Sequence, residues 1–293
     1  MAEPVLLRTR EILAVSRPVS WINTAYPFGA AYLLTSGRID AAFVIGVVFF
    51  LIPYNLAMYG INDVFDYASD LANPRKGGME GTVLDRGAHR VVLVAAIASC
   101  VPFVVALVVL GDPASWAVLA VSLFAVAAYS VPGLRFKERP FLDSVTSSTH
   151  FVSPAVYGLV LAGARPTGAL VALLAAFFLW GMASHAFGAV QDVVPDRAGG
   201  IRSIATVMGA RWTVRFALAC WTTAGVLMLF TTWPGPLAAL AAIPYLWAAF
   251  PFRSITDELS PAANRGWRRF IWLNYAVGFF ITMLLIAYAI ARG

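Results

Sequence analysis

The stretch Gly60-Ile-Asn-Asp-Val-Phe-Asp-Tyr-Ala-Ser-Asp70 decides the fold of this chain, because it directly follows a long apolar run, Ala41 to Met58. It brings together four polar side chains: Asn62, Asp63, Asp66 and Asp70. On a helix these side chains span roughly 100° of arc and share one face. Clustered carboxylates repel one another unless a cation lies among them. Oxygen ligands suit Mg²⁺, which commonly binds substrate phosphates as well, so the stretch predicts a Mg²⁺–phosphate site at a membrane surface.

The composition indicates a polytopic membrane protein. The chain has 293 residues, of which 60% are hydrophobic and only 12% are charged. A soluble domain has roughly 25% charged residues. Cys100 and Cys220 both lie in apolar runs, where we expect buried small hydrophobic side chains rather than a disulfide.

Apolar segments of on the order of 20 residues predict about nine transmembrane helices and an all-α fold. The expected spans are 19–36, 40–60, 91–110, 114–131, 145–163, 167–190, 212–232, 236–250 and 269–291. The span at 236–250 is short, which indicates a tilted helix or one that extends into its neighbours.

The distribution of basic residues predicts how the chain is oriented in the membrane. With nine spans, 18 of the 21 Lys and Arg residues fall on one side, and only Arg38, Arg165 and Arg292 fall on the other. The positive-inside rule makes the rich side cytoplasmic, with the N-terminus inside and the C-terminus outside. Topology therefore explains the net charge of +6, and we expect the lipid bilayer rather than a nucleic acid as partner. The longer loops fall on the cytoplasmic side, so the function is expected there.

A second acidic cluster, Gly188-Ala-Val-Gln-Asp-Val-Val-Pro-Asp196, follows the sixth predicted helix. Asp192 and Asp196 have the spacing of Asp66 and Asp70, which indicates a weak internal repeat of the kind found in membrane proteins. In this superposition Gly188 takes the position of Asn62, and Ala189 that of Asp63. Pro195 is expected to end or kink the helix before Asp196.

Both clusters precede loops that contain glycine and basic residues. Two facing carboxylate clusters would hold Mg²⁺ ions that clamp a diphosphate, with basic side chains neutralising the remaining oxygens. The candidate diphosphate ligands are Arg75, Lys76, Arg135, Lys137, Arg197 and Arg202. The alternative is that the carboxylates are solvated helix ends and that each basic residue serves topology or lipid headgroups.

The two clusters resemble the aspartate-rich motifs of the UbiA superfamily of intramembrane prenyltransferases. Asn62, Asp63, Asp66 and Asp70 match the first motif, N-D-x-x-D-x-x-x-D, in full. The second motif is often D-x-x-D-x-x-x-D, and here Ala189 replaces its first acid. The resemblance implies one domain over 1–293, a nine-helix bundle around a central cavity, and cytoplasmic motif loops at 61–90 and 191–211 that cap it. The implied reaction is Mg²⁺-dependent transfer of a prenyl group from an allylic diphosphate to a lipophilic acceptor.

A narrower resemblance concerns the acceptor. The stretches 16–28, 135–143, 150–154 and 185–192 look like the lycopene elongase branch, which adds C5 units from dimethylallyl diphosphate to lycopene in the synthesis of C50 carotenoids. Alternative acceptors within the family are an aromatic or quinone ring, a tetrapyrrole and a glycerol phosphate lipid. A membrane transporter is a further alternative, because acids and repeats also mark ion pathways. A CDP-alcohol phosphotransferase is not supported, because its D-G-x-x-A-R spacing is absent.

The last step of such a reaction requires a proton acceptor or an ordered water near the cavity. His150 and His185 are candidates, although a hydrogen-bonded structural histidine is the competing interpretation. Tyr67 and Tyr129 are candidates for lining the acceptor pocket and stabilising a cation. Asp143 opens the fifth predicted helix and is expected to cap its N-terminus.

Overall fold

Polar caps, glycines and prolines divide this apolar chain into helices. The computed structural model describes residues 10–67, 84 and 86–292, and those residues form helices and no strands. Asp40 caps α3 by accepting a hydrogen bond from the Phe43 N–H, and Asp112 caps α7 in a capping box with Ser115. Gly37, with φ +66°, ends α2.

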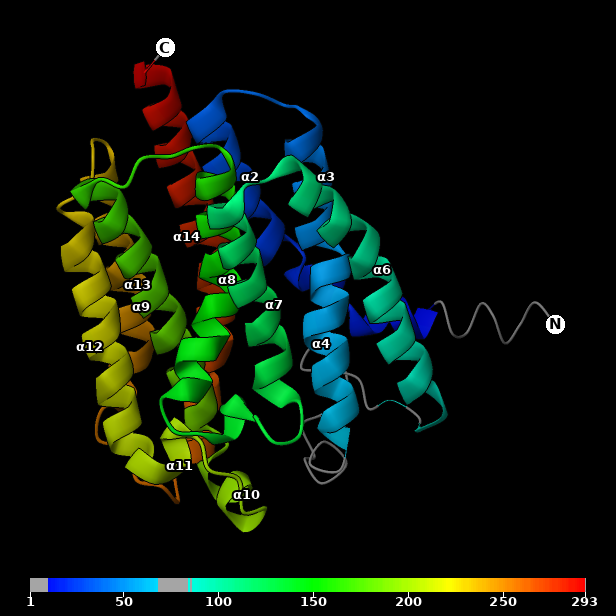
Figure 1. Cartoon of the computed structure of the whole chain (residues 1–293). Coiled ribbons are helices and arrows are strands. Elements are labelled where there is room, and N and C mark those ends of the chain that lie inside the picture. Colours follow the sequence, from blue (N-terminus) through cyan, green and yellow to red (C-terminus); the bar gives the residue numbers. More distant parts are fainter. Residues whose placement is uncertain (1–9, 68–83, 85, 293) are drawn as a thin grey trace. The chain divides into compact units, whose positions relative to one another are not determined.

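The helices of the described residues follow the predicted order (Figure 1). The α-helices are α2 (Ile22–Ser36), α3 (Ala41–Leu51), α4 (Pro53–Phe65), α6 (His89–Leu110), α7 (Pro113–Ser130), α8 (Leu142–Leu161), α9 (Gly168–Val190), α10 (Val193–Ala198), α11 (Ile204–Met208), α12 (Ala210–Met228), α13 (Ala242–Ala249) and α14 (Asn264–Arg292). Short 3₁₀ helices lie between them: η1 (Pro18–Ser20), η2 (Arg86–Ala88), η3 (Phe136–Glu138), η4 (Gly235–Ala241), η5 (Phe250–Phe252) and η6 (Ser260–Ala263).

Six helical stretches of the described residues are long and apolar enough to cross a bilayer: Ala41–Phe65, Arg86–Leu110, Pro113–Ser130, Gly168–Val190, Gly235–Phe252 and Ser260–Arg292. The predicted count of nine spans is therefore not confirmed. The helix α2 has only 15 residues. The helices α8 and α12 are long enough, but α8 opens with a run of polar residues and α12 carries two arginines in its first two turns.

Two predicted spans are built differently from a single α-helix. The expected span 40–60 consists of α3 and α4, which are separated at Ile52, and α4 continues to Phe65. The first acidic motif therefore begins inside the last turns of a membrane helix. The expected short span 236–250 is extended on both sides of α13 by the 3₁₀ helices η4 and η5.

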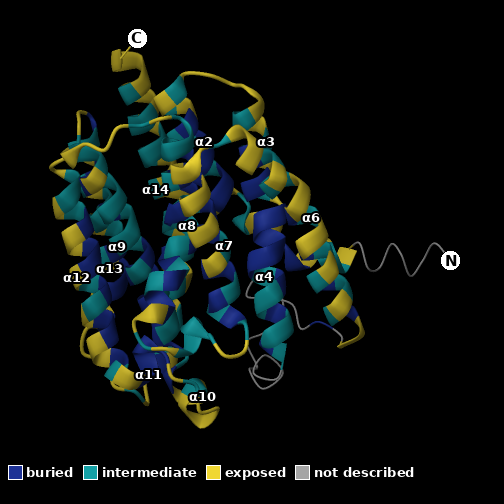
Figure 2. Cartoon of the chain, viewed as in Figure 1, coloured by how far each residue is buried: buried dark blue, intermediate teal, exposed yellow. Residues whose placement is uncertain are grey.

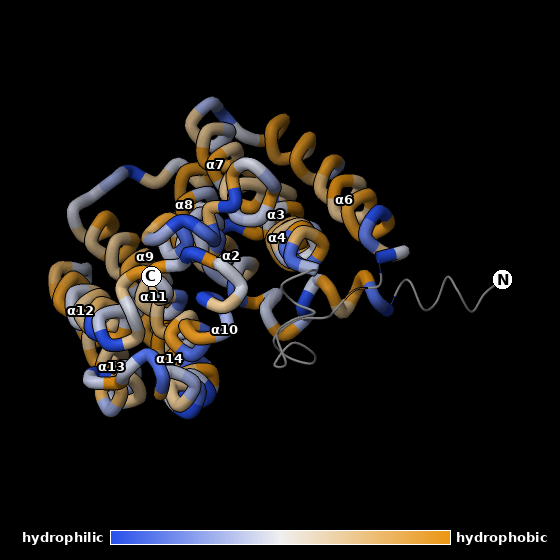
Figure 3. Tube along the Cα trace, turned by 90° about the horizontal axis from the view of Figure 1, so that it is seen from below, coloured by the Kyte–Doolittle hydropathy of each residue, from blue (hydrophilic) through white to orange (hydrophobic). Residues whose placement is uncertain are grey.

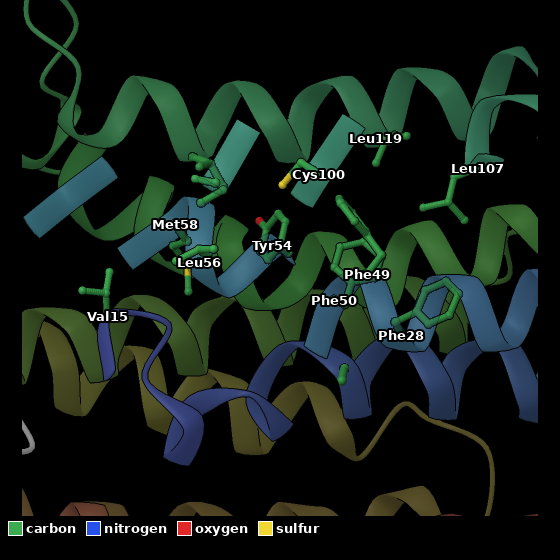
Figure 4. Close-up of a cluster of buried hydrophobic side chains, with 14 of the residues drawn as sticks. Val15, Phe28, Phe49, Phe50, Tyr54, Leu56, Met58, Cys100, Leu107 and Leu119 are labelled. Atoms are coloured by element: carbon green, nitrogen blue, oxygen red, sulfur yellow. The ribbon is translucent and has the colours of Figure 1, made fainter. Parts of the chain in front are cut away.

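The chain divides into two compact units, Met1–Phe136 with His150–Ala164, and Lys137–Thr149 with Arg165–Gly293. In the first unit α2 packs on α3, and α4 packs on α6 and α7. Its core is aromatic: the Phe50 ring centroid lies 5.2 Å from that of Phe28, 4.9 Å from that of Phe49 and 5.1 Å from that of Tyr54 (Figure 4).

The second unit is built on the α9–α12 pair, with α13 against α12 and α14. Its core is again rich in aromatic side chains, and the Trp221 ring stacks on Tyr245 with centroids 5.6 Å apart. Each unit thus has its own hydrophobic core.

The exposed face of α6 is apolar. Figure 2 shows α6 largely exposed, and Figure 3 shows the same helix as mostly hydrophobic. Its exposed side chains include Val94, Ile97, Val101 and Val105, a spacing that defines one helical face. A continuous exposed apolar face fits the hydrocarbon of a bilayer and not water. The chain is an all-helical membrane protein.

Candidate active site

The first acidic motif lies at the C-terminal end of α4, in the first unit. Asn62 and Asp63 occupy the last helical turn, and Asp66 is the C-cap, whose N–H still bonds to the Asn62 carbonyl. This geometry keeps Asn62 and Asp66 on one face, as predicted. Asp63 is 1% exposed and Asp66 is 8% exposed. Asp70, Arg75 and Lys76 lie outside the described residues.

Asn62 holds the motif in place through its amide group. Its Nδ2 donates to Asp66 Oδ2 at 2.8 Å and to Ser130 Oγ, at the end of α7, at 2.9 Å. Both hydrogens of the side-chain amide are thereby used, so the side-chain oxygen, Oδ1, is the atom of this amide that can bind a cation. Together with the Asp66 carboxylate this is a hard-oxygen donor set of the kind that Mg²⁺ prefers.

Two arginines contact the acids of this motif. Arg17 Nη2 lies 2.8 Å from Asp63 Oδ1, and its guanidinium lies 4.2 Å from the centroid of the Tyr59 ring. Arg135 Nη2 lies 4.0 Å from Asp66 Oδ1. Both arginines have left-handed backbone angles, φ +50° at Arg17 and φ +40° at Arg135. Such conformations are unfavourable for a residue with a β-carbon and are found at functional sites.

Asp63 therefore has a different environment from the one predicted for it. The motif predicts a metal ligand, whereas the structure pairs this buried carboxylate with Arg17, which the sequence marked only as a topological charge. No sequence pattern predicted that Ser130 orients Asn62. No spacing rule points to Arg17, because 46 residues separate it from Asp63.

The second acidic cluster follows α9 in the second unit. The helix ends at Val190, and Asp192 is the N-cap of α10, which contains Asp196. The predicted span 167–190 ends at the same residue, and the break lies before Asp196, as expected from Pro195, which has no N–H to bond the carbonyl of Gln191, four residues before it. Asp192 and Asp196 are each partly exposed.

Packing explains why the second cluster has glycine at the position of Asn62. A β-carbon at Gly188, the counterpart of Asn62, would lie 3.1 Å from the Trp267 ring. Gln191 is buried, donates from its side chain to the Gly188 carbonyl and accepts from Asn264. Side-chain packing therefore fills this end of α9 at the position where the first motif has Asn62.

The candidate diphosphate ligands that the structure describes differ in their surroundings. Arg197 is held within the second unit: its Nη1 donates to Asp257 Oδ2 at 2.5 Å and its Nε donates to the Thr206 carbonyl at 2.9 Å. Arg202 is exposed, and Lys137 is partly exposed in η3. Arg135 lies beside the first motif, with its Nη2 4.0 Å from Asp66 Oδ1.

The Arg197–Asp257 pair also anchors α12. Burial would raise the pKa of Asp257, but hydrogen bonds from the Ala210 N–H and from Arg197, with the charge of Arg197, outweigh it and lower the pKa below its ordinary value. Arg197 therefore stabilises the loop 191–211, which was predicted to be cytoplasmic. This structural role differs from the diphosphate binding that the sequence predicts for Arg197.

The aromatic and histidine candidates are divided between the two units. In the first unit, Tyr67 lies edge-to-face with His89, at 5.0 Å between centroids, and Tyr129 lies edge-to-face with His150, at 5.3 Å. In the second unit, His185 Nε2 lies 3.8 Å from Asp143 Oδ2. Within the described residues no three His, Cys, Asp or Glu side chains lie close enough to hold a metal ion.

Asp143 is not the simple helix cap that the sequence predicts. Its side chain is fully buried, its Oδ1 accepts from the adjacent Ser144 N–H, and its Oδ2 accepts from the Ile204 N–H at the start of α11. A cap would accept from the second or third N–H of its own helix. Asp143 instead joins the start of α8 to α11.

Comparison with known proteins identifies the class. Residues 24–274 match the UbiA prenyltransferase family. A UbiA homolog from Archaeoglobus fulgidus, solved with DMAPP and Mg²⁺, has the same fold: TM-score 0.66, 18% identity, and coverage of 91% of this chain and 98% of that one. The chain belongs to the UbiA family of membrane prenyltransferases, and its helix-end acidic motifs fit that class.

Three of its sequence relatives are named for lycopene or C50 carotenoid chemistry. A lycopene elongase/hydratase of Corynebacterium glutamicum is 54% identical over 282 residues, 96% of this chain and 98% of that protein. The C(50) beta-cyclic carotenoids biosynthesis protein LbtBC of Dietzia sp. is 56% identical over 272 residues, 92% of this chain and 63% of that protein. A lycopene elongase/hydratase of Halobacterium salinarum is 34% identical over 280 residues, 94% of this chain and 96% of that protein. The predicted resemblance to the lycopene elongase branch is confirmed.

Proposed function

We propose that this enzyme transfers a prenyl group from dimethylallyl diphosphate to lycopene, with Mg²⁺, in the synthesis of C50 carotenoids. The observation that carries the proposal is the Asn62–Asp66 pair, fixed by Ser130 and faced by Arg135, in a chain 54% identical to a lycopene elongase/hydratase. Relatives named digeranylgeranylglyceryl phosphate synthase are more distant, at 25% identity over 241 residues.

The residues have distinct roles in this proposal. Asn62, Asp66 and Asp70 of the first motif and Asp192 and Asp196 of the second would hold Mg²⁺. Held by these residues, Mg²⁺ would supply positive charge that stabilises the diphosphate leaving group.

The chain's own basic groups assist that departure. Arg135 lies beside Asp66 and would contact the diphosphate oxygens, together with Arg75, Lys76, Lys137 and Arg202. Asp63 and Arg17 hold the end of α4 in position. Apolar and aromatic side chains exclude water from the allylic cation, and Tyr67 and Tyr129 are the proposed aromatic contacts.

The proposed orientation follows the distribution of charge. The sides defined by nine spans would place the N-terminus and both motif loops in the cytoplasm and the C-terminus outside. One domain over 1–293 would then present both acidic clusters to a water-soluble donor, while the acceptor enters from the bilayer.

An acceptor competition tests the function. Membranes that contain the chain receive dimethylallyl diphosphate and Mg²⁺ with lycopene, an aromatic acid or a geranylgeranylated glycerol phosphate lipid in parallel. We expect C45 and C50 products from lycopene alone. Prenylation of one of the other acceptors, with lycopene unchanged, would overturn the assignment of the acceptor while retaining the enzyme class.

A further inference from the structure

A buried polar group at the start of α8 has no role in the site described above. The Asp143 side chain is fully buried. It accepts hydrogen bonds from the Ser144 N–H at 2.7 Å and from the Ile204 N–H at 2.6 Å, and its Oδ2 lies 3.8 Å from His185 Nε2. A buried carboxylate is costly unless such partners surround it. The two backbone N–H groups supply its hydrogen bonds, and His185 lies at ion-pair distance, beyond hydrogen-bond range.

The helix packing sets this pair. Ser148 Oγ on α8 donates to the Phe178 carbonyl on α9 at 2.7 Å. The helices approach closely there because position 181 is glycine: a β-carbon on Gly181 would lie 2.4 Å from Ser148 Oγ. One turn onward along α9, and one turn back along α8, the same packing brings His185 to Asp143.

His185 lies on α9, the helix that leads into the second acidic cluster. It precedes Asp192 by seven residues, roughly 10 Å along the helix axis. His185 is partly exposed, whereas His150 is buried and lies against the Tyr129 ring. His185 is thus the more accessible of the two candidate histidines, and it lies beside a carboxylate.

We propose that His185 is the catalytic proton acceptor of the reaction and that Asp143 is its positioning residue, an inference that rests on the proposed function. The Nε2 atom faces Asp143, so Nδ1 is the ring nitrogen turned away from the carboxylate. The negative charge of the carboxylate, 3.8 Å from the ring, attracts the imidazolium that forms when Nδ1 takes a proton.

The donor's allylic C–O bond breaks, and its electron pair leaves with the diphosphate. A terminal double bond of the acceptor supplies the electrons of the new C–C bond, which leaves a tertiary cation on the acceptor. The carbon next to the cation loses its proton to Nδ1, and the C–H electrons form a double bond. If water adds to the cation instead, Nδ1 takes the proton that the water loses.

The test uses the purified full-length enzyme with dimethylallyl diphosphate, lycopene and Mg²⁺. The readouts are kcat, the KM of the donor, and the ratio of alkene to alcohol products. His185→Gln removes the basic nitrogen and is expected to lower kcat about 100-fold, the lower part of the range for loss of a general base, with donor KM unchanged. The product ratio shifts as well, because the remaining quenching is by unassisted water.

Asp143 is tested through rescue and a matched control. Asp143→Asn is expected to lower kcat and to shift the product ratio in the same direction as His185→Gln, and Asp143→Glu restores part of both. Asp112→Asn removes a carboxylate from another helix start, where Asp112 accepts from the Ser115 N–H, and leaves kcat and the ratio unchanged. If Asp143→Asn does not fold, His185→Gln decides.

Different outcomes test the proposed function and the role of His185. A wild-type enzyme that forms no product from lycopene contradicts the proposed function itself. A productive wild type whose His185→Gln variant keeps its kcat and product ratio contradicts the assignment of His185. An increase in donor KM that matches the whole loss of kcat/KM would also overturn it, since that pattern indicates impaired binding.

Discussion

Arg17 and Asp63, 46 residues apart in the sequence, form an ion pair in which the Asp63 carboxylate is fully buried and lies 2.8 Å from the guanidinium. This pair ties the segment before α2 to the last turn of α4. It gives one acid of the first motif a structural partner, while Asn62 and Asp66 face the candidate metal position.

Removal of Arg17 alone is expected to destabilise the protein strongly. Arg17→Ala would leave the buried Asp63 charge without its partner, at a cost of about 3 kcal/mol. The double variant Arg17→Ala/Asp63→Asn should recover part of this loss, because the uncompensated charge is gone. Thermal unfolding in detergent measures both, and equal melting temperatures for the single and double variants would contradict the account.

The Ser130 hydroxyl is expected to orient Asn62 and not to bind the metal itself. Ser130→Ala removes one hydrogen bond, worth about 1 kcal/mol, so the Mg²⁺ concentration for half-maximal rate should rise about fivefold. Asn62→Ala, which also loses the contact with Asp66, should have a larger effect. Binding of Mn²⁺ followed by its spin resonance gives a second readout, and unchanged Mn²⁺ affinity in both variants would exclude this role.

Substitution of Arg135 should weaken donor binding, whereas substitution of Arg197 should lower stability. Arg135→Ala is expected to raise the donor KM about tenfold, the effect of losing one charge-assisted contact, with little change in stability. Arg197→Ala should instead lower the melting temperature, because Arg197 bonds Asp257 and the Thr206 carbonyl. The reverse pattern would show that Arg197 contacts the diphosphate.

Asp257 gives a prediction about pH. Its pKa is lowered from the ordinary 3.8, so its stabilising contribution is complete above that value and is lost as the pH falls through the lower pKa of the folded protein. The melting temperature of Asp257→Asn should therefore lie below that of the wild type by a constant amount from pH 8 to about pH 5, and the gap should close below about pH 4. A gap that closes near neutral pH would contradict the pairing with Arg197.

The sequence predicted the helical fold and the first motif well, because both depend on local patterns. Apolar runs identified the helices, and the spacing of Asn62 and Asp66 placed them on one face, where they hydrogen-bond. The partners of these groups depend on tertiary contacts. The pairing of Arg17 with Asp63, and that of Asp143 with Ile204 and His185, joins residues with no periodic relation and therefore leaves no signal in a single sequence.

The most direct test of the central claim follows carbon-13-labelled dimethylallyl diphosphate into lycopene. Purified enzyme, lycopene and Mg²⁺ are incubated with the labelled donor, and the pigments are separated by mass for the wild type, Asp66→Asn and the control Asp40→Asn. We predict labelled C45 and C50 products from the wild type and from Asp40→Asn, and a rate about 100-fold lower from Asp66→Asn, because a ligand of the leaving-group metal is lost. Unlabelled lycopene from the wild type, or full activity of Asp66→Asn, would contradict the account.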